Sequence, residues 1–87
     1  MSFDPSRGYE KHPQVAIRRE EFGGLAYHYG NRRLVFLRSP ALADLVEALA
    51  DFPDADRALT ASVPAGSRTS YEKALGSLLS SEVIRVR

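Results

Sequence analysis

Leu25, Tyr27 and Tyr29 alternate with Ala26 and His28 before Gly30-Asn31, and a continuous apolar run from Leu34 to Leu37 follows it. The two runs predict a pair of β-strands. Because glycine and asparagine tolerate positive φ, we expect a tight hairpin with a two-residue loop between them. Such a loop fixes the register and places Tyr27 opposite Leu34. The other facing pairs are then Leu25 with Phe36, Ala26 with Val35, and Gly24 with Leu37.

A further strand is predicted before this hairpin, because Val15, Ile17 and Arg19 alternate with Ala16 and Arg18. Together the three strands would form an antiparallel meander. The last strand presents Val35 and Leu37 on one face, where its neighbour contributes only small side chains. This face of the sheet therefore needs a covering element.

Helices are predicted after the sheet. Ser39 can cap the first turn of a helix and proline is favoured at its first position, so Ser39-Pro40 predicts a helix start. Thr69 and Glu72 have the spacing of a capping box, which predicts another helix from there to about Ser80. A short helix is expected between these two, around residues 55–59. The first helix would cover the sheet with an apolar face of Leu42, Leu45, Val46 and Leu49.

The first 13 residues are polar and interrupted by proline and glycine, so residues 1–13 are expected to form a flexible tail. Residues 14–87 would then form one small domain. Three strands followed by three helices predict an α+β fold of the winged helix-turn-helix type, with a three-stranded antiparallel sheet on its N-terminal side. The final residues, 83–87, alternate and would form either a short strand or an ordered tail.

Composition limits the classes of function. The chain has no cysteine, which excludes disulfides, thiolate metal sites and cysteine nucleophiles. Without cysteines, a secretion signal or a long apolar run, the expected location is the cytoplasm and no membrane partner is expected. The formal net charge of +1 gives no argument for a nucleic-acid partner.

Candidate chemistry is sparse. His12 lies in the expected tail and His28 lies on a strand beside a turn, so the two histidines do not predict a metal site. We expect His28 to be exposed or half-exposed. No serine has a nucleophile-elbow context, and no pair of carboxylates has a spacing that predicts acid and base catalysis. The chain is therefore predicted not to be an enzyme.

The last strand of the meander would be an edge strand, and nothing in the sequence obviously protects it. An extended peptide could pair with it as a fourth strand and place side chains on Val35 and Leu37 or against the third helix. Arginines near the ends of this groove would favour an acidic peptide. Alternatively, Val35 and Leu37 simply pack beneath a helix. The same free edge would also permit a homodimer.

The segment EFGGLAYHYGNRRLVFLRSPAL, with PQVAIR before it and LADFPDADRAL after it, closely resembles the peptide chaperones of mycofactocin biosynthesis. These belong to the PqqD-like recognition elements of ribosomally made, post-translationally modified peptides (RiPPs). The resemblance covers roughly Pro13 to Ile84. It is densest at Phe22-Gly23, Tyr27, Tyr29, Arg33-Leu34, Phe36-Leu37 and Ser39-Pro40.

The resemblance implies a non-catalytic protein without a cofactor. It would bind the leader of a short precursor peptide and present it to a radical S-adenosylmethionine (SAM) maturase, which modifies the precursor's C-terminal valine and tyrosine. Relatives bind the leader as a strand added to the third strand, in a cleft shared with the third helix. Mapped onto this chain, the expected peptide-binding residues are Arg33, Leu34, Val35, Phe36, Leu37 and Arg38 on the strand and Tyr71, Ala74, Leu75 and Leu78 on the helix.

A winged-helix transcriptional regulator that binds DNA is the alternative function. A recognition helix needs basic or amide side chains directed at phosphates and bases. The third helix, SYEKALGSLLSSE, has one lysine against two acidic residues, and the arginines lie elsewhere. The residues therefore favour a peptide partner over a nucleic acid.

Overall fold

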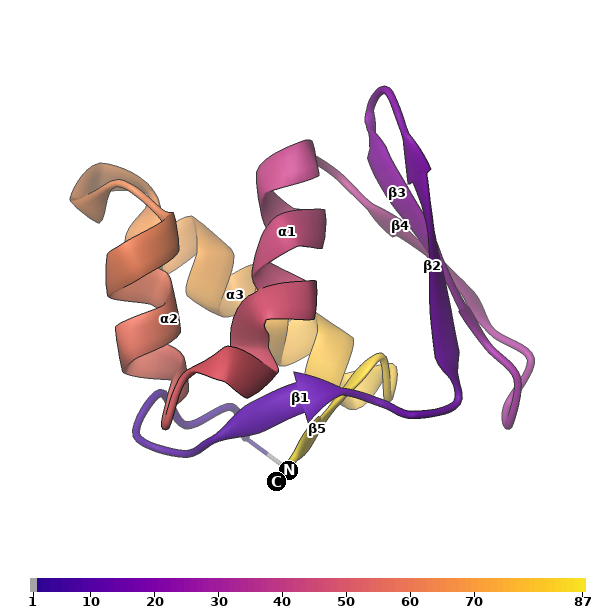
Figure 1. Cartoon of the computed structure of the whole chain (residues 1–87), viewed down its shortest axis with the longest axis horizontal. Helices are drawn as coiled ribbons and strands as arrows, with labels where there is room; N and C mark the ends of the chain where they lie inside the picture. Colours follow the sequence, from indigo (N-terminus) through magenta and orange to yellow (C-terminus); the bar gives the residue numbers. More distant parts are fainter. Residues whose placement is uncertain (1) are drawn as a thin grey trace.

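The computed structural model describes residues 2–87 and divides them between two small sheets and a group of helices. Strands β2, β3 and β4 form one antiparallel sheet in that order, and β1 pairs with β5 in a second sheet (Figure 1). In chain order the elements are β1 (Tyr9–Lys11), β2 (Val15–Glu20), β3 (Gly23–His28), β4 (Leu34–Leu37), α1 (Pro40–Ala48), the 3₁₀ turn η1 (Leu49–Asp51), α2 (Ala55–Ser62), the 3₁₀ turn η2 (Ala65–Ser67), α3 (Arg68–Ser80) and β5 (Ile84–Val86).

The β3–β4 hairpin has the predicted register. Tyr27 pairs with Leu34, and the facing pairs continue without interruption to Gly24 and Leu37. As predicted, β2 pairs with β3 and completes an antiparallel meander.

The turn of this hairpin differs from the predicted two-residue loop. Within the described chain, Arg32 carries the positive φ of the turn (60°), and neither Gly30 nor Asn31 has one. The Arg32 amide donates to the carbonyl oxygen of His28 over 2.7 Å, and the His28 amide donates to the Arg33 carbonyl oxygen, so the loop comprises residues 29–32. The loop is longer than expected by one residue on each strand, so the positions that face one another do not change. The register is therefore preserved although the expected turn was wrong.

Helix α1 covers the inner face of the three-stranded sheet, as predicted (Figure 1). The side-chain hydroxyl of Ser39 accepts a hydrogen bond from the Leu42 amide (3.1 Å), and Pro40 is the first helical residue, so the predicted N-cap is confirmed. This packing buries Leu37 fully. Other buried residues of this layer are Ala26, Leu42, Ala43, Leu45, Val46 and Leu49.

An ion-pair cluster joins the exposed side of α1 to the sheet. The guanidinium of Arg19 on β2 donates to the carboxylates of Asp44 and Glu47, each over 2.7 Å. These two hydrogen bonds raise the pKa of Arg19, that to Glu47 being the larger cause. The cluster fixes the orientation of α1 over β2.

Part of the expected flexible tail belongs to the second sheet. Tyr9 pairs with Val86, its side chain is buried, and the ring of Phe3 stacks on it with the centroids 5.0 Å apart. The fold therefore includes residues before Gln14, the expected start of the domain. Of the two forms expected for the last residues, the structure contains the strand, as β5. A three-residue strand has too few positions to show a period of two, which is why β1 was missed.

Helices α2 and α3 form in the predicted regions, but the capping box is wrong. Helix α3 begins at Arg68, one residue before Thr69, and the N-cap Ser67 makes no side-chain hydrogen bond. The turn η2 runs directly into α3, so no extended N-cap residue precedes the helix. Glu72 instead accepts a hydrogen bond from Arg68 Nε (2.7 Å), and Arg68 also donates to Asp56 on α2.

The α+β class, the N-terminal meander and the three α-helices after it are thus confirmed, while the two-stranded sheet of β1 and β5 was not predicted. None of the helices in residues 2–87 is long and apolar enough to cross a membrane.

Candidate functional site

Strand β4 is the edge of the three-stranded sheet, as predicted. The His28 amide donates to the Arg33 carbonyl oxygen over 2.9 Å, so Arg33 directs its main-chain groups at β3. In an antiparallel ladder this orientation alternates, so the main-chain groups of Leu34 and Phe36 point away from β3 toward the free edge. An extended chain would find hydrogen-bonding partners along this edge.

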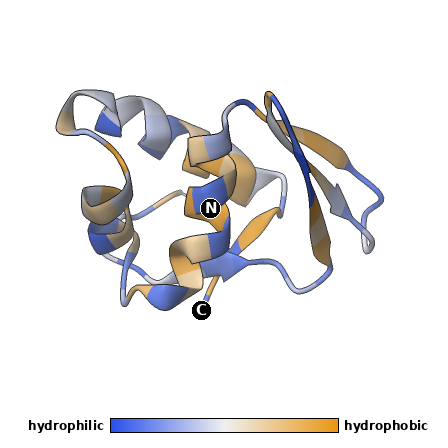
Figure 2. Ribbon diagram, turned by 45° about the horizontal axis from the view of Figure 1, so that its top comes forward, coloured by the Kyte–Doolittle hydropathy of each residue, from blue (hydrophilic) through white to orange (hydrophobic). Residues whose placement is uncertain are grey.

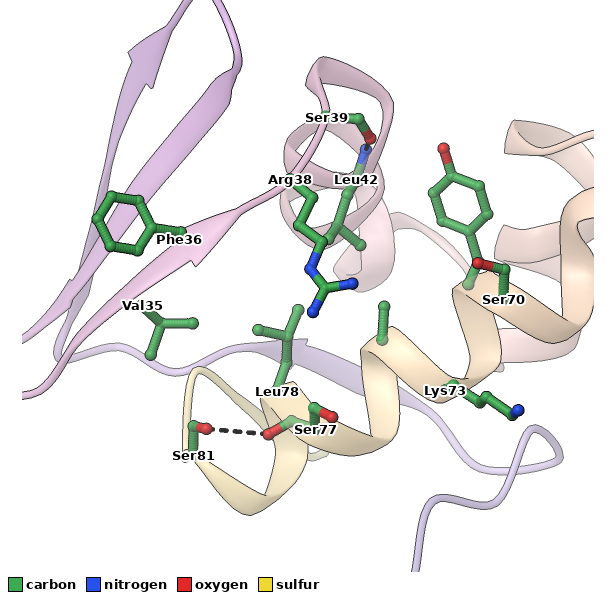
Figure 3. Close-up of a pocket in the computed structure, with 12 residues that line it drawn as sticks. Val35, Phe36, Arg38, Ser39, Leu42, Ser70, Lys73, Ser77, Leu78 and Ser81 are labelled. Atoms are coloured by element: carbon green, nitrogen blue, oxygen red, sulfur yellow. Dashed lines mark hydrogen bonds between the residues drawn. The ribbon is translucent and has the colours of Figure 1, made fainter.

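A cleft of about 490 Å³ lies between β4, the start of α1 and α3. Figure 3 shows Val35 projecting from β4 toward α3, while Phe36 projects to the other side of the strand. The side chain of Leu78 rises from α3 into the space between the two elements. The cleft therefore has the free edge of a strand on one side and a helix face on the other.

Six of the ten expected peptide-binding residues line this cleft: Val35, Phe36, Arg38, Tyr71, Ala74 and Leu78. The other four lie elsewhere. Leu37 and Leu75 are fully buried in the core, whereas Arg33 and Leu34 are exposed outside the cleft lining. Leu34 has its side chain on the opposite face of β4 from Val35, and only its main-chain groups point toward the free edge.

Sequence reasoning missed a polar stripe along the same wall. Ser70, Lys73, Ser77 and Ser81 line the cleft beside Ala74, and their intervals of three and four residues place them on one helix face. The spacing is visible in the sequence, but the peptide-binding residues of α3 were predicted from its apolar positions alone. Ser39 and Leu42 complete the lining at the start of α1.

The cleft is positively charged. Arg38 and Lys73 are the charged residues of its lining, and neither forms an ion pair within residues 2–87. The Arg38 side chain extends into the space above Leu78 (Figure 3). Charged donors and serine hydroxyls in this arrangement suit a ligand that carries carboxylates.

Arg68 stabilises the N-terminal end of α3 and does not contribute to the positive charge of the cleft lining. It bridges Glu72 and Asp56. The hydrogen bond to Glu72 and then that to Asp56 raise the pKa of the Arg68 guanidinium. The position of the α3 wall is thus fixed from α2.

His12 and His28, which the sequence placed in unrelated regions, lie side by side with their ring centroids 4.5 Å apart. His28 is only 4% exposed, so its expected exposed position is wrong. Its Nδ1 accepts hydrogen bonds from the amides of Gly30 (3.0 Å) and Asn31 (3.1 Å), which explains its burial at the turn. Among the described residues, no three His, Asp or Glu side chains gather as a metal site. The histidine pair therefore supports the hairpin turn.

Comparison with known proteins gives one consistent family. The family model of the peptide chaperone MftB family matches residues 8–85. A peptide chaperone MftB of Mycolicibacterium smegmatis is 42% identical over 85 residues, which cover 97% of this chain and 83% of that relative. The Mycobacterium ulcerans protein of the same name is 42% identical over 84 residues, covering 95% and 77%.

A third relative of that name, from Mycobacterium tuberculosis, is 54% identical over 52 residues. The match covers 60% of this chain and 48% of that relative, so it spans about half the length of the relative. No solved structure matches, and the winged-helix label stays a prediction.

The family and these relatives are named as peptide chaperones and not as enzymes, which agrees with the predicted lack of catalysis. They also agree with the resemblance in the segment from residue 21 to residue 42. The match to the family model covers most of the chain, and two of the relatives match nearly all of it. The chain therefore belongs to the peptide chaperone MftB family.

Proposed function

We propose that this protein binds the leader of a ribosomally made mycofactocin precursor peptide as a strand added to β4, and presents it to a radical SAM maturase in the cytoplasm. One observation carries the proposal: the free edge of β4 opens onto the cleft beside α3. The family supports a peptide as the partner. The main-chain groups of Leu34 and Phe36 would supply the hydrogen bonds of the new strand.

Side chains of the bound leader would alternate between two environments. Those that point inward would enter the cleft between Val35 and the α3 wall at Ala74 and Leu78. Arg38 and Lys73 would favour acidic side chains there, because the described residues that line the cleft include no acid. Main-chain pairing would supply affinity and the cleft would supply selectivity.

Such binding assists catalysis through effective concentration. A leader held on β4 while the protein docks on the maturase converts an encounter with a flexible peptide into a tethered one. Short flexible links give local concentrations on the order of millimolar. The leader is also ordered before it reaches the enzyme, so this entropic cost falls on the binding step.

The test is calorimetric titration of the leader into the Val35→Asp variant, which introduces a negative charge at a half-buried position of the cleft lining. We expect binding to be abolished while the circular dichroism spectrum is retained. Ala61→Asp is the matched control, because it adds the same charge at an exposed position of α2 outside the cleft, and it should bind like wild type.

A second variant covers the case in which Val35→Asp fails to fold. Ser77 is exposed and lines the cleft, so Ser77→Asp places a negative charge in the cationic groove without disturbing the core. We expect weaker leader binding for this variant as well. Unchanged leader affinity in a folded Ser77→Asp or Val35→Asp protein would contradict the proposed site.

A further inference from the structure

The outer face of the three-stranded sheet carries an apolar surface that the fold does not use. Four large apolar side chains are exposed: Phe22 (47%), Tyr29 (62%), Leu34 (55%) and Phe36 (65%). Leu25 and Tyr27 lie on the same face, because they pair with Phe36 and Leu34. We call these six residues the outer face.

These side chains form one continuous surface. The rings of Phe22 and Phe36 lie 6.0 Å apart, and those of Tyr27 and Tyr29 meet edge-to-face at 4.9 Å. Tyr27 also faces Leu34 across the strand pair. Figures 1 and 2 show α1 against the inner face and no other element of the described chain over the outer face. Contiguous exposed apolar surface of this kind marks interaction sites.

Charges of opposite sign lie at its two ends. Glu21 is exposed at the β2–β3 turn beside Phe22, and its neighbour Glu20 forms an ion pair with Arg18 over 2.9 Å. Arg32 and Arg33 are exposed at the other end of the hairpin. Neither arginine forms an ion pair within residues 2–87. A partner would therefore need an apolar centre with charges in the opposite order.

The outer face also borders the proposed leader site. Leu34 and Phe36 direct their main-chain groups at the free edge and their side chains at the outer face. Phe36 additionally lines the cleft. A strand added at this edge would place every second side chain about 4.5–5.5 Å from Leu34 or Phe36, on the outer face. The bound leader would thereby extend this apolar surface.

We propose that the outer face is the docking surface for the enzyme that modifies the peptide, and that the enzyme contacts the chaperone and the bound leader together across it. This inference rests on the proposed leader binding. It selects the maturase because a protein that acts on the same peptide gains affinity from a surface that the peptide completes. A second copy of this chain has no such requirement for the leader.

The test measures maturase affinity for the wild-type chaperone and for the double variant Phe22→Ser and Tyr29→Ser, each with and without leader. Both residues are exposed and lie outside the cleft lining, so leader affinity should be unchanged. We expect the double variant to bind the maturase about tenfold more weakly, as loss of aromatic anchors does. The conservative variants Phe22→Leu and Tyr29→Phe should retain docking.

Two outcomes would overturn this inference alone. One is normal leader binding together with unchanged maturase affinity in the double variant. The other is a leader-independent wild-type dimer by sedimentation that the double variant converts to monomer, which would assign the outer face to a second copy. Failure of the wild-type protein to bind leader would instead overturn the proposed function itself.

Discussion

The imidazole rings of His12 and His28 lie 4.5 Å apart between centroids, and each accepts backbone hydrogen bonds at Nδ1. His12 accepts from the Gln14 amide (3.1 Å). A ring nitrogen that accepts a hydrogen bond carries no proton, so the hydrogen bond from the Gln14 amide favours the neutral form of the His12 ring. The pair joins the β1–β2 connection to the turn of the β3–β4 hairpin.

We expect the free energy of unfolding to decrease as the pH falls below about 6.5. Burial lowers the pKa of His12, and the nearby His28 and Arg85 lower it further against the opposing effect of Glu82 and Glu10. The folded protein therefore favours the neutral ring, and the unfolded chain binds more protons. This contribution is complete above the unfolded pKa and is lost as the pH falls through the lower folded value.

Urea unfolding at about pH 7.5 and about pH 5 measures this dependence on either side of the ordinary histidine pKa. The variant His12→Gln provides the control, because it removes the titrating ring. It should lose less stability between the two pH values than wild type. An equal loss in both proteins would assign the dependence to other groups.

The variant Gly23→Ala should unfold more easily, by about 1–3 kcal/mol or more. Gly23 has φ of 148°, and a Cβ there would press on the Leu37 carbonyl and lie 2.7 Å from the Ser39 nitrogen. Gly66→Ala is the matched control, because nothing lies within 4 Å of its Cβ. It should change stability by no more than about 0.5 kcal/mol. Chemical denaturation measures the free energy of unfolding of both variants. Equal losses of stability in the two would contradict the close approach of the backbone at Gly23.

Tyr9 tests whether the N-terminal segment belongs to the fold. Its ring is buried and stacked on Phe3, and its hydroxyl accepts from the Asp4 amide (2.8 Å). We expect Tyr9→Ala to reduce the free energy of unfolding by about 3–5 kcal/mol. Tyr29→Ala removes an exposed ring and should cost at most about 0.5 kcal/mol. A Tyr9 variant as stable as wild type would mean that residues before Gln14 form a tail.

The charge of the cleft predicts a salt-dependent affinity for the leader. Arg38→Gln should weaken leader binding about two- to fivefold at low salt, the size expected of one exposed ion pair. The Arg38→Gln and Lys73→Gln double variant should also show a smaller decrease of affinity with ionic strength. Arg57→Gln on α2 removes a charge outside the cleft and serves as the control. Equal salt dependence of leader affinity in the wild type, the double variant and Arg57→Gln would contradict a role for Arg38 and Lys73.

The sequence was sufficient for the hairpin register because the facing pairs are counted outward from Gly30-Asn31, and a longer loop with the same centre leaves them unchanged. Its turn could not be predicted, since the choice of Arg32 over Gly30 for positive φ depends on the acceptor that His28 provides. The β1–β5 pairing was missed for a related reason. It joins the two ends of the chain, and neither segment shows a pattern when taken alone.

The candidate cleft was expected from the free edge of β4, from the apolar side chains of that strand and from the family resemblance. The individual side chains were less predictable. Leu75 is one residue from Ala74, and this step of about 100° around α3 moves it from the cleft into the core. Leu37 shares a face with Val35 but lies beneath α1. Which members of a face reach a cleft depends on where the next element crosses it, and that is a tertiary property.

The most direct measurement of the central claim is a backbone amide NMR titration of the labelled protein with the leader of a mycofactocin-type precursor. A strand added to β4 predicts shifts concentrated at residues 33–38 and along the α3 wall from Tyr71 to Leu78, with new protection from exchange at the amides of Leu34 and Phe36. A folded protein whose spectrum is unmoved at high peptide excess, or whose shifts avoid β4, would contradict the account.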